Sequence, residues 1–375
     1  MKKILITGGA GFIGSHLSDL LIAKGYRVTV FDNLDPQVHP KGEIPGYLNK
    51  KVRFIKGNVV DYNALKDAVL ANDCIFHFAA AVGVGQSQYQ ISKYVNTNIC
   101  GTANLLDILV NTKHKIKKVI VAASMSSYGE GPARCNRCGI FKPELRRLKE
   151  GKIVRRHSYW EIKCPVCSAI CFPVPADEKT FLNPSSIYAI TKKVQEETCI
   201  LVGRTYGIPV VSLRFFNVYG PRQSLSNPYT GVAAIFINRI KNNNPPVIFE
   251  DGLQTRDFIW VQDVAKACIL ALESEKSDYE SFNVGTGKPI SILEIAKILI
   301  RLSGKDINPH ITYRFRKGDV RHCFADISKI KRVLGFEPEI SLIDGLKRLV
   351  DWSVTADAGD RFDSALRELQ NKNLV

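Results

Sequence analysis

Short apolar runs alternate with stretches of helical periodicity along the first 220 residues. The apolar runs predict strands at 4–7, 27–31, 52–56, 75–79, 119–123 and 210–216. Between them, apolar residues recur at helical spacing, which predicts helices at 13–24, 64–71, 92–112 and 186–205. Near-continuous apolar strands that alternate with helices are typical of a parallel, doubly wound α/β sheet covered on both faces.

The pattern loosens after about residue 221. "NNNPPV" and "DGLQTRD" are loop signals, and "SILE" predicts a capping box at the start of a helix. Helices are predicted at 232–241, 291–304, 326–334 and 342–355. We therefore expect a main unit over residues 1–220 and a smaller α/β lobe over 221–375, partly interleaved with the first.

A glycine-rich turn, "ILITGGAGFIGSHL", joins the first strand to the first helix. Gly8 permits a tight turn, Gly11 lets backbone approach a pyrophosphate, and Gly14 allows close packing of helix and strand. Asp32 ends the second strand 18 residues after Gly14, where a carboxylate binds a ribose 2′-hydroxyl and repels a 2′-phosphate. The pattern predicts a Rossmann-type domain that binds NAD rather than NADP, although Asp32 could also be a simple turn residue.

A tyrosine and a lysine four residues apart, Tyr188 and Lys192 in "SSIYAITKK", lie on one face of a predicted helix. A nearby ammonium favours the phenolate, so it should bring the tyrosine towards a useful pKa. Ser124 ends the fifth strand, at the edge of a parallel sheet where ligands bind. With a dinucleotide site, these three residues predict a hydride-transfer centre. Taken alone, the Tyr–Lys pair would suggest only a surface helix, and Ser124 a turn hydroxyl.

Motifs along nearly the whole chain resemble the nucleotide-sugar epimerases and dehydratases of the extended short-chain dehydrogenase/reductase family. They are "TGGAGFIGSHL", "GNVVD", "FHFAA", "NTNICGTANLL", "YAITK", "RFFNVYGPRQ", "TRDFIWVQDVA" and "FNVGTG". The resemblance implies that Tyr188 is the general base and acid. It also implies that Ser124 orients and relays a proton, and that Lys192 binds the nicotinamide ribose and tunes Tyr188.

The resemblance further implies two sets of binding residues. The cofactor set is Gly8, Gly11, Phe12, Ile13, Gly14, Asp32, Asn33, Asn58, Val59, Ala79, Ala80, Asn98, Tyr188 and Lys192. "GNVV" lacks the acidic residue that is usual beside the adenine, which puts that one contact in doubt. Substrate contacts are implied for Ser126 and Asn217, and diphosphate contacts for Arg256 and Arg321, whose guanidinium forks suit phosphate oxygens.

The residues after Ser124 discriminate between reactions. Dehydratases of the family carry an Asp-Glu pair there, whereas this chain has Met125 and Ser126, and Met125 cannot transfer a proton. The resemblance therefore implies either a nucleotide-sugar 4-epimerase with NAD as a recycled cofactor, or a 4-dehydrogenase/reductase.

Two CxxC pairs lie in an insert at about 130–176, between Ser124 and Tyr188. Cys135 and Cys138 are separated from Cys164 and Cys167 by 25 residues, a spacing that favours a structural zinc ribbon over a redox pair or disulfides. Cys171 is a fifth thiol that could replace Cys167. The other cysteines are expected to be reduced thiols.

The net charge of +16 predicts an anionic partner, or else a solvated basic surface. Residues 134–172 hold ten basic and three acidic residues, so a nucleic-acid-binding or NAD-sensing regulator is an alternative from another class. A nucleotide-sugar substrate is a simpler anionic partner, and we expect no nucleic acid. No apolar run approaches the roughly 18 residues of a membrane span, and the N-terminus does not resemble a signal peptide, so a cytoplasmic protein is expected.

Finer resemblances concern substrate and assembly. The insert, the segment "DNLDPQVHP" and the terminal "LRELQNKNLV" resemble bacterial dTDP-L-rhamnose 4-epimerases, which make dTDP-6-deoxy-L-talose. The helices at 92–112 and 186–205 resemble those that form the four-helix dimer interface of the family, which implies a homodimer.

Overall fold

A seven-stranded, wholly parallel sheet organises the N-terminal part of this computed structural model, which describes residues 2–146, 153–356 and 358–375. Its order is β13-β9-β5-β4-β1-β2-β3. The strands are β1 (Lys3–Thr7), β2 (Arg27–Asp32), β3 (Arg53–Lys56), β4 (Cys74–His77), β5 (Lys118–Ser124), β9 (Val210–Phe215) and β13 (Ser281–Val284). The expected Rossmann-type α/β fold is confirmed.

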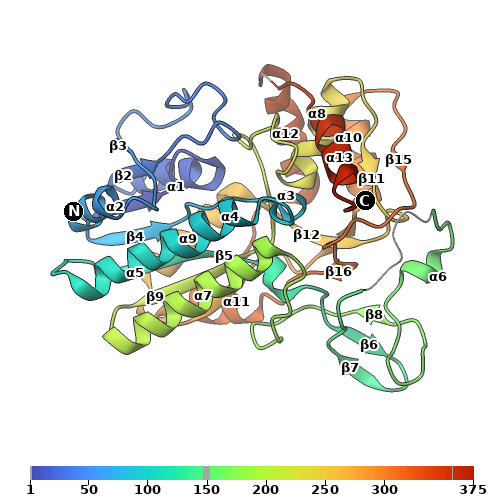
Figure 1. Ribbon diagram of the computed structural model, residues 1–375, viewed down its shortest axis with the longest axis horizontal. Helices are drawn as coiled ribbons and strands as arrows, with labels where there is room; N and C mark the ends of the chain where they lie inside the picture. Colours follow the sequence, from blue (N-terminus) through green and yellow to red (C-terminus); the bar gives the residue numbers. More distant parts are fainter. Residues whose placement is uncertain (1, 147–152, 357) are drawn as a thin grey trace.

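Helices cover both faces of the sheet (Figure 1). One apolar core packs α1 (Phe12–Ala23) and α9 (Val261–Glu273) against it. The other face carries α2 (Tyr62–Leu70), α5 (Gly101–Asn111) and α7 (Ile187–Tyr206). The helix predicted over 92–112 is a run of three pieces. They are α4 (Ile91–Tyr94), a π-helix (Val95–Cys100) and α5.

The C-terminal lobe packs three helices around a second core. These are α8 (Val232–Lys241), α10 (Ile292–Ser303) and α12 (Leu342–Thr355). The capping box predicted at Ser291 is present, with Glu294 as its partner. Beside them lie β10 (Asn217–Tyr219), β11 (Val247–Ile248), β12 (Thr255–Trp260), β14 (Pro289–Ser291), β15 (His310–Ile311) and β16 (His322–Cys323). β13 is an edge strand of the first sheet and α9 packs against that sheet, although both come from beyond residue 221, so the two parts are interleaved.

Further elements lie outside the cysteine insert. They are α3 (Val84–Ser87), α11 (Ser328–Leu334), α13 (Phe362–Asn371) and 3-10 turns at Met125–Tyr128 and Glu275–Ser277. Sequence reasoning did not predict α13, which lies in the upper right of Figure 1, where its Asp363 pairs with Arg239 of α8 at 2.9 Å.

The cysteine insert forms a small lobe of its own beneath the C-terminal lobe (Figure 1). It contains a three-stranded sheet of order β7-β6-β8 and the short helix α6 (His157–Trp160). The strands are β6 (Ala133–Cys135), β7 (Gly139–Phe141) and β8 (Phe172–Pro173). Part of the predicted insert, residues 147–152, lies outside the described residues.

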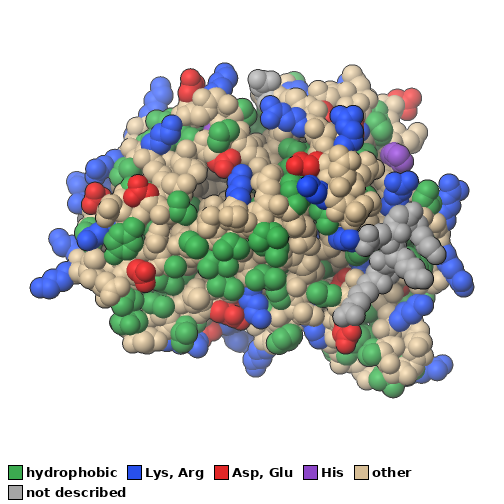
Figure 2. Space-filling model, viewed as in Figure 1, with side chains coloured by type: hydrophobic (Ala, Val, Ile, Leu, Met, Phe, Trp, Pro, Cys, Tyr) green, Lys and Arg blue, Asp and Glu red, His purple; other side chains and the backbone are tan. Residues whose placement is uncertain are grey.

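Apolar side chains gather on the outer face of α4 and α7 (Figure 2). Ile91, Ile190 and Leu201 are all exposed there. Among the described residues, no helix is long and apolar enough to cross a membrane.

Candidate active site

The turn between β1 and α1 is shaped by glycines in the way the sequence predicts. Gly8 has φ +70°, and a Cβ there would lie 2.7 Å from the backbone nitrogen of Ala79. A Cβ on Gly14 would lie 2.7 Å from the Cα of Gly9, so α1 can approach the turn only without side chains. Gly11 precedes the first turn of α1 with extended backbone, which leaves the N-terminus of the helix open to an anion. The cradle fits a pyrophosphate.

Asp32 ends β2 beside this turn. One carboxylate oxygen accepts the N–H of Ala10 at 3.0 Å, and the other accepts the N–H of Leu34 at 2.9 Å. Burial raises the pKa of Asp32, while these hydrogen bonds act in the opposite direction. Each oxygen keeps a lone pair for a ribose hydroxyl, so the residue fits its expected role.

The remaining predicted cofactor residues occupy different environments. Those with side chains partly or fully exposed are Phe12, Ile13, Asn33, Asn58, Ala79 and Ala80. The side chain of Val59 is buried against Gly101 in the core, so only its backbone could face an adenine.

Asn98 links two elements near the predicted cofactor site. It is fully buried in the π-helical segment, where its oxygen accepts the N–H of Ala81 at 2.8 Å. Its Nδ2 donates to the Ala81 carbonyl and to Thr191 Oγ1. Its amide thus ties the loop after β4 to α7, and direct binding of the cofactor by Asn98 stays a prediction.

The three predicted catalytic residues converge at the C-terminal end of β5. Ser124 ends that strand, and its Oγ accepts the hydroxyl of Ser126 at 2.9 Å. Tyr188 lies in the first turn of α7, where its N–H donates to Ser87 Oγ at 3.0 Å. Lys192, one turn later, is buried and donates to the carbonyl of Ala122 at 2.8 Å.

The pKa values of Tyr188 and Lys192 differ from those expected from the sequence. Burial raises the pKa of Tyr188 to about 12, although a hydrogen bond with Ser124 acts in the opposite direction. Burial also lowers the pKa of Lys192 to about 7. The expected lowering of the pKa of Tyr188 by the Lys192 ammonium is not seen; the opposing effect comes from Ser124 alone. Lys192 donates instead to Ala122 and to Gln195 Oε1 at 2.7 Å.

A cavity of about 230 Å³ extends from this end of β5 into the C-terminal lobe. Three of the four predicted substrate residues, Ser126, Asn217 and Arg256, line it. Asn217 Oδ1 is buried and has no hydrogen-bond partner among the described residues, so it is free to accept a bond from a ligand. The cavity therefore combines apolar walls with a few polar groups, as ligand sites do.

Arg321 is not in the cavity, which corrects the prediction that it binds the diphosphate. It is fully buried, and its guanidinium donates to Glu161, Glu250 and Asp251. Arg316, which sequence reasoning missed, lines the cavity instead and forks onto Asp319 at 2.8 and 2.9 Å. The sequence gives no signal that separates these two arginines.

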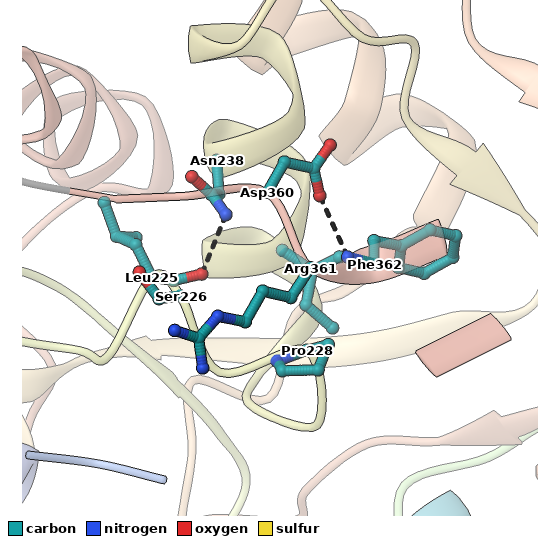
Figure 3. Close-up of a pocket in the computed structure, with 8 residues that line it drawn as sticks. Leu225, Ser226, Pro228, Asn238, Asp360, Arg361 and Phe362 are labelled. Atoms are coloured by element: carbon teal, nitrogen blue, oxygen red, sulfur yellow. Dashed lines mark hydrogen bonds between the residues drawn. The ribbon is translucent and has the colours of Figure 1, made fainter. Parts of the chain in front are cut away.

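Helix α13 supplies one wall of the cavity through Phe362, Ala365, Leu366 and Leu369. Figure 3 shows the start of this helix beside a second, smaller pocket, where Asp360 accepts the N–H of Phe362. On the other side of that pocket, Asn238 of α8 donates to the carbonyl of Leu225. Leu369 faces Gly85, where an added Cβ would lie 3.3 Å from its Cδ2. The cavity thus depends on a helix far along the chain from the catalytic motifs.

The insert brings the four predicted thiols together. The Sγ atoms of Cys135, Cys138, Cys164 and Cys167 lie within 4.8 Å of one another. Cys171 is outside this group and donates to the carbonyl of Ala169. All ten cysteines are free thiols. Four thiolates in such a cluster fit a tetrahedral zinc ion.

Comparison with known proteins defines the family. The model of the NAD dependent epimerase/dehydratase family matches residues 4–144 and 168–285, interrupted within the insert. The chain belongs to this family, and its relatives show it to be an NAD-dependent nucleotide-sugar epimerase.

Individual relatives are similar over nearly their whole length. The dTDP-L-rhamnose 4-epimerase of Burkholderia thailandensis is 35% identical over 354 residues, 94% of each chain. The solved UDP-glucose 4-epimerase of Thermotoga maritima, with UDP-glucose, has a TM-score of 0.76 and 32% identity, covering 94% of this chain and 98% of that one. The UDP-glucuronic acid 4-epimerase of Bacillus cereus, in complex with UDP-glucuronic acid and NAD, has a TM-score of 0.75 and 30% identity, covering 93% and 98%.

Proposed function

We propose that this chain is a 4-epimerase of a dTDP-linked 6-deoxyhexose, interconverting dTDP-L-rhamnose and dTDP-6-deoxy-L-talose. The similarity to a dTDP-L-rhamnose 4-epimerase over 94% of both chains carries the proposal. The cavity lining supports it, because Val84, Met125 and Leu369 are apolar and suit a methyl group better than a hydroxymethyl or carboxylate group.

The proposed roles of the catalytic residues follow from their positions. The phenolic oxygen of Tyr188 takes the proton from O4 of the sugar and later returns it, while the Ser124 hydroxyl hydrogen-bonds O4. NAD held at the glycine turn would supply a reversible hydride acceptor for C4, so that the hydride could return to the opposite face of the sugar. Tyr188 must ionise for this, so the positive charge of the oxidised cofactor and of Lys192 would offset the cost of burying a phenolate.

The substrate would be held by its diphosphate while the keto sugar turns. We assign this anchoring to the guanidinium groups of Arg256 and Arg316, with Asn217 Oδ1 accepting from the sugar or the phosphate side. Both arginines line the cavity, and arginine forks match phosphate oxygens. The smaller lobe is thus the substrate-binding part, and the glycine turn holds the cofactor.

We also propose that the insert binds one structural zinc ion through Cys135, Cys138, Cys164 and Cys167. The lobe has a core of only a few buried residues, and lobes of this size commonly need a metal to fold.

The decisive experiment incubates the purified protein, without added cofactor, with dTDP-L-rhamnose, UDP-glucose, UDP-glucuronate and UDP-N-acetylglucosamine. We expect a C4 epimer of dTDP-L-rhamnose and no net NADH. Stoichiometric NADH release would instead show a 4-dehydrogenase. Turnover of a UDP-sugar alone would contradict the dTDP assignment. Salt-dependent nucleic-acid binding with no turnover would favour a regulator.

Replacement of the general base tests the chemistry directly. Tyr188→Phe should lower kcat about 10²- to 10⁴-fold, the usual contribution of a proton-transfer group, without changing the fold. Tyr206→Phe, at the exposed end of the same helix, is the matched control and should retain full activity. A fully active Tyr188→Phe would refute the catalytic assignment.

A further inference from the structure

The cysteine insert is joined to the substrate lobe by buried ion pairs rather than by a loose surface contact. Arg146 of the insert donates to Glu130 Oε1 and to Glu250 Oε1, both at 2.7 Å, and all three side chains are nearly inaccessible. Arg146 Nη1 also donates to the backbone carbonyl of Trp160 at 3.5 Å, and Trp160 is 1% exposed. A buried, hydrogen-bonded charge network holds one geometry firmly, because breaking it leaves charges unpaired.

Arg321 is the centre of this network. Its guanidinium donates to Glu161 of the insert, and also to Glu250 at 2.9 Å and Asp251 at 2.6 Å in the lobe. Its backbone N–H donates to Glu130 Oε2 at 2.7 Å. Glu130 of the insert therefore holds the backbone of Arg321, and Glu161 of the insert holds its guanidinium group.

The fixed segment is also a wall of the cavity. The carbonyls of Val320 and Arg321 accept the guanidinium of Arg256 at 2.6 and 3.1 Å. Val320, Asp319 and Arg316 themselves line the cavity. Any shift of residues 316–321 would therefore move both arginines that face the ligand.

The other end of the connection leads directly to the thiol cluster. Glu161 precedes Ile162, whose carbonyl accepts the N–H of Cys171 at 2.9 Å, and the N–H of Cys164 donates to Ala169 at 2.8 Å. These bonds close the hairpin that carries two of the four clustered thiols.

We propose that the cysteine insert is a positioning device for the substrate cavity: through Glu161, Glu130 and Arg146 it holds residues 316–321, and thereby Arg256 and Arg316, in the geometry that binds a nucleoside diphosphate. The inference rests on the proposed function in one respect: it assumes that the cavity binds a nucleoside diphosphate. Glu161, Glu130 and Arg146 are positioning residues, since none of them lines the cavity.

The test is Glu161→Gln, with binding of dTDP and UDP measured by calorimetry and KM and kcat measured with the turned-over sugar nucleotide. Removing a negative charge would by itself strengthen the binding of an anion, whereas loss of positioning weakens it, so the two effects have opposite signs. We expect the Kd for dTDP and the KM to rise about 3- to 30-fold, with kcat unchanged.

The matched control is Asp278→Asn. Like Glu161→Gln, this substitution removes one negative charge from a carboxylate that pairs with a buried cation, here Lys118 at 2.5 Å. Asp278, however, lies at the opposite end of the sheet. The substitution should lower the melting temperature without changing dTDP affinity. If Glu161→Gln does not fold, Arg146→Lys replaces it, because it keeps the charge but loses the fork.

Unchanged or tighter dTDP binding by a folded Glu161→Gln or Arg146→Lys variant would overturn the inference. So would an equal loss of affinity in Asp278→Asn, which would indicate general destabilisation. A wild-type protein that binds dTDP but turns over no sugar nucleotide would refute the proposed function alone, because the comparison of Kd values still decides the positioning role.

Discussion

At the scale of single residues, Lys192 shows how the core supports the chemistry. Its ammonium donates to Gln195 Oε1, and Gln195 Nε2 donates to Thr102 Oγ1 at 2.9 Å. This series of hydrogen bonds ends at His77, which is fully buried between Thr102 and Thr7. Burial lowers the pKa of His77 to about 3. A neutral imidazole there adds no charge to repel Lys192, so this buried series fixes the lysine without opposing its ionisation.

Gln195→Met should therefore change the pH dependence of the reaction. Loss of a buried hydrogen bond to the ammonium costs about 1.5–3 kcal/mol, which lowers the pKa of Lys192 by roughly 1–2 units. Because the charged form of Lys192 is needed, the alkaline limb of the kcat profile should move to lower pH by about that amount. Gln262→Met, on the exposed side of α9, is the control, and an alkaline limb that did not move would contradict this role.

The positions of functional residues could be predicted from the sequence wherever a motif fixes the backbone conformation as well as the side chain. Gly8, Gly14 and Asp32 lie as expected because their local conformation follows from the turn itself. Arg321 was misplaced, because its partner Glu161 is distant in the sequence and no spacing rule connects the two residues. Whether an arginine faces a ligand or a carboxylate depends on tertiary contacts.

At the scale of elements, the strands and helices that were predicted end within about two residues of the observed ones, but other elements were missed, among them α9, β13, α13 and the π-helical segment. The signal for α13 was present: Phe362, Ala365, Leu366 and Leu369 have the spacing of an apolar helical stripe. The π-helical segment at Val95–Cys100 was predicted as ordinary helix, and no feature of the sequence marked it as different.

The two CxxC pairs allow the proposed metal ligands to be tested one cysteine at a time. Cys167 belongs to the group of clustered thiols and Cys171, four residues later, does not. Cys167→Ser should reduce zinc from about one ion per chain to near zero and lower the melting temperature, whereas Cys171→Ser should keep the ion. Elemental analysis with thermal melting measures both. Equal zinc content in the two variants, or no zinc in the wild type, would rule out the proposed ligand set.

At the scale of the whole molecule, the apolar face on α4 and α7 calls for a partner. Ile190 and Leu201 are three helical turns apart on α7 and so lie on one side, with Leu201 65% exposed. Figure 2 shows apolar side chains continuing from there across α4. A contiguous apolar surface typically marks an interface, and two copies related by a two-fold axis could bury it against itself. We propose that the protein is a homodimer through these helices.

Leu201→Glu should dissociate that dimer. A carboxylate on this face would have to be buried without a counter-ion, a cost of several kcal/mol per interface, whereas the monomer fold is unaffected because the side chain is exposed. Val166→Glu introduces the same change at an exposed apolar residue of the insert and should leave the dimer intact. Sedimentation velocity distinguishes the species: a monomeric wild type, or a Leu201→Glu variant that still sediments as a dimer, would show that copies do not associate through this face.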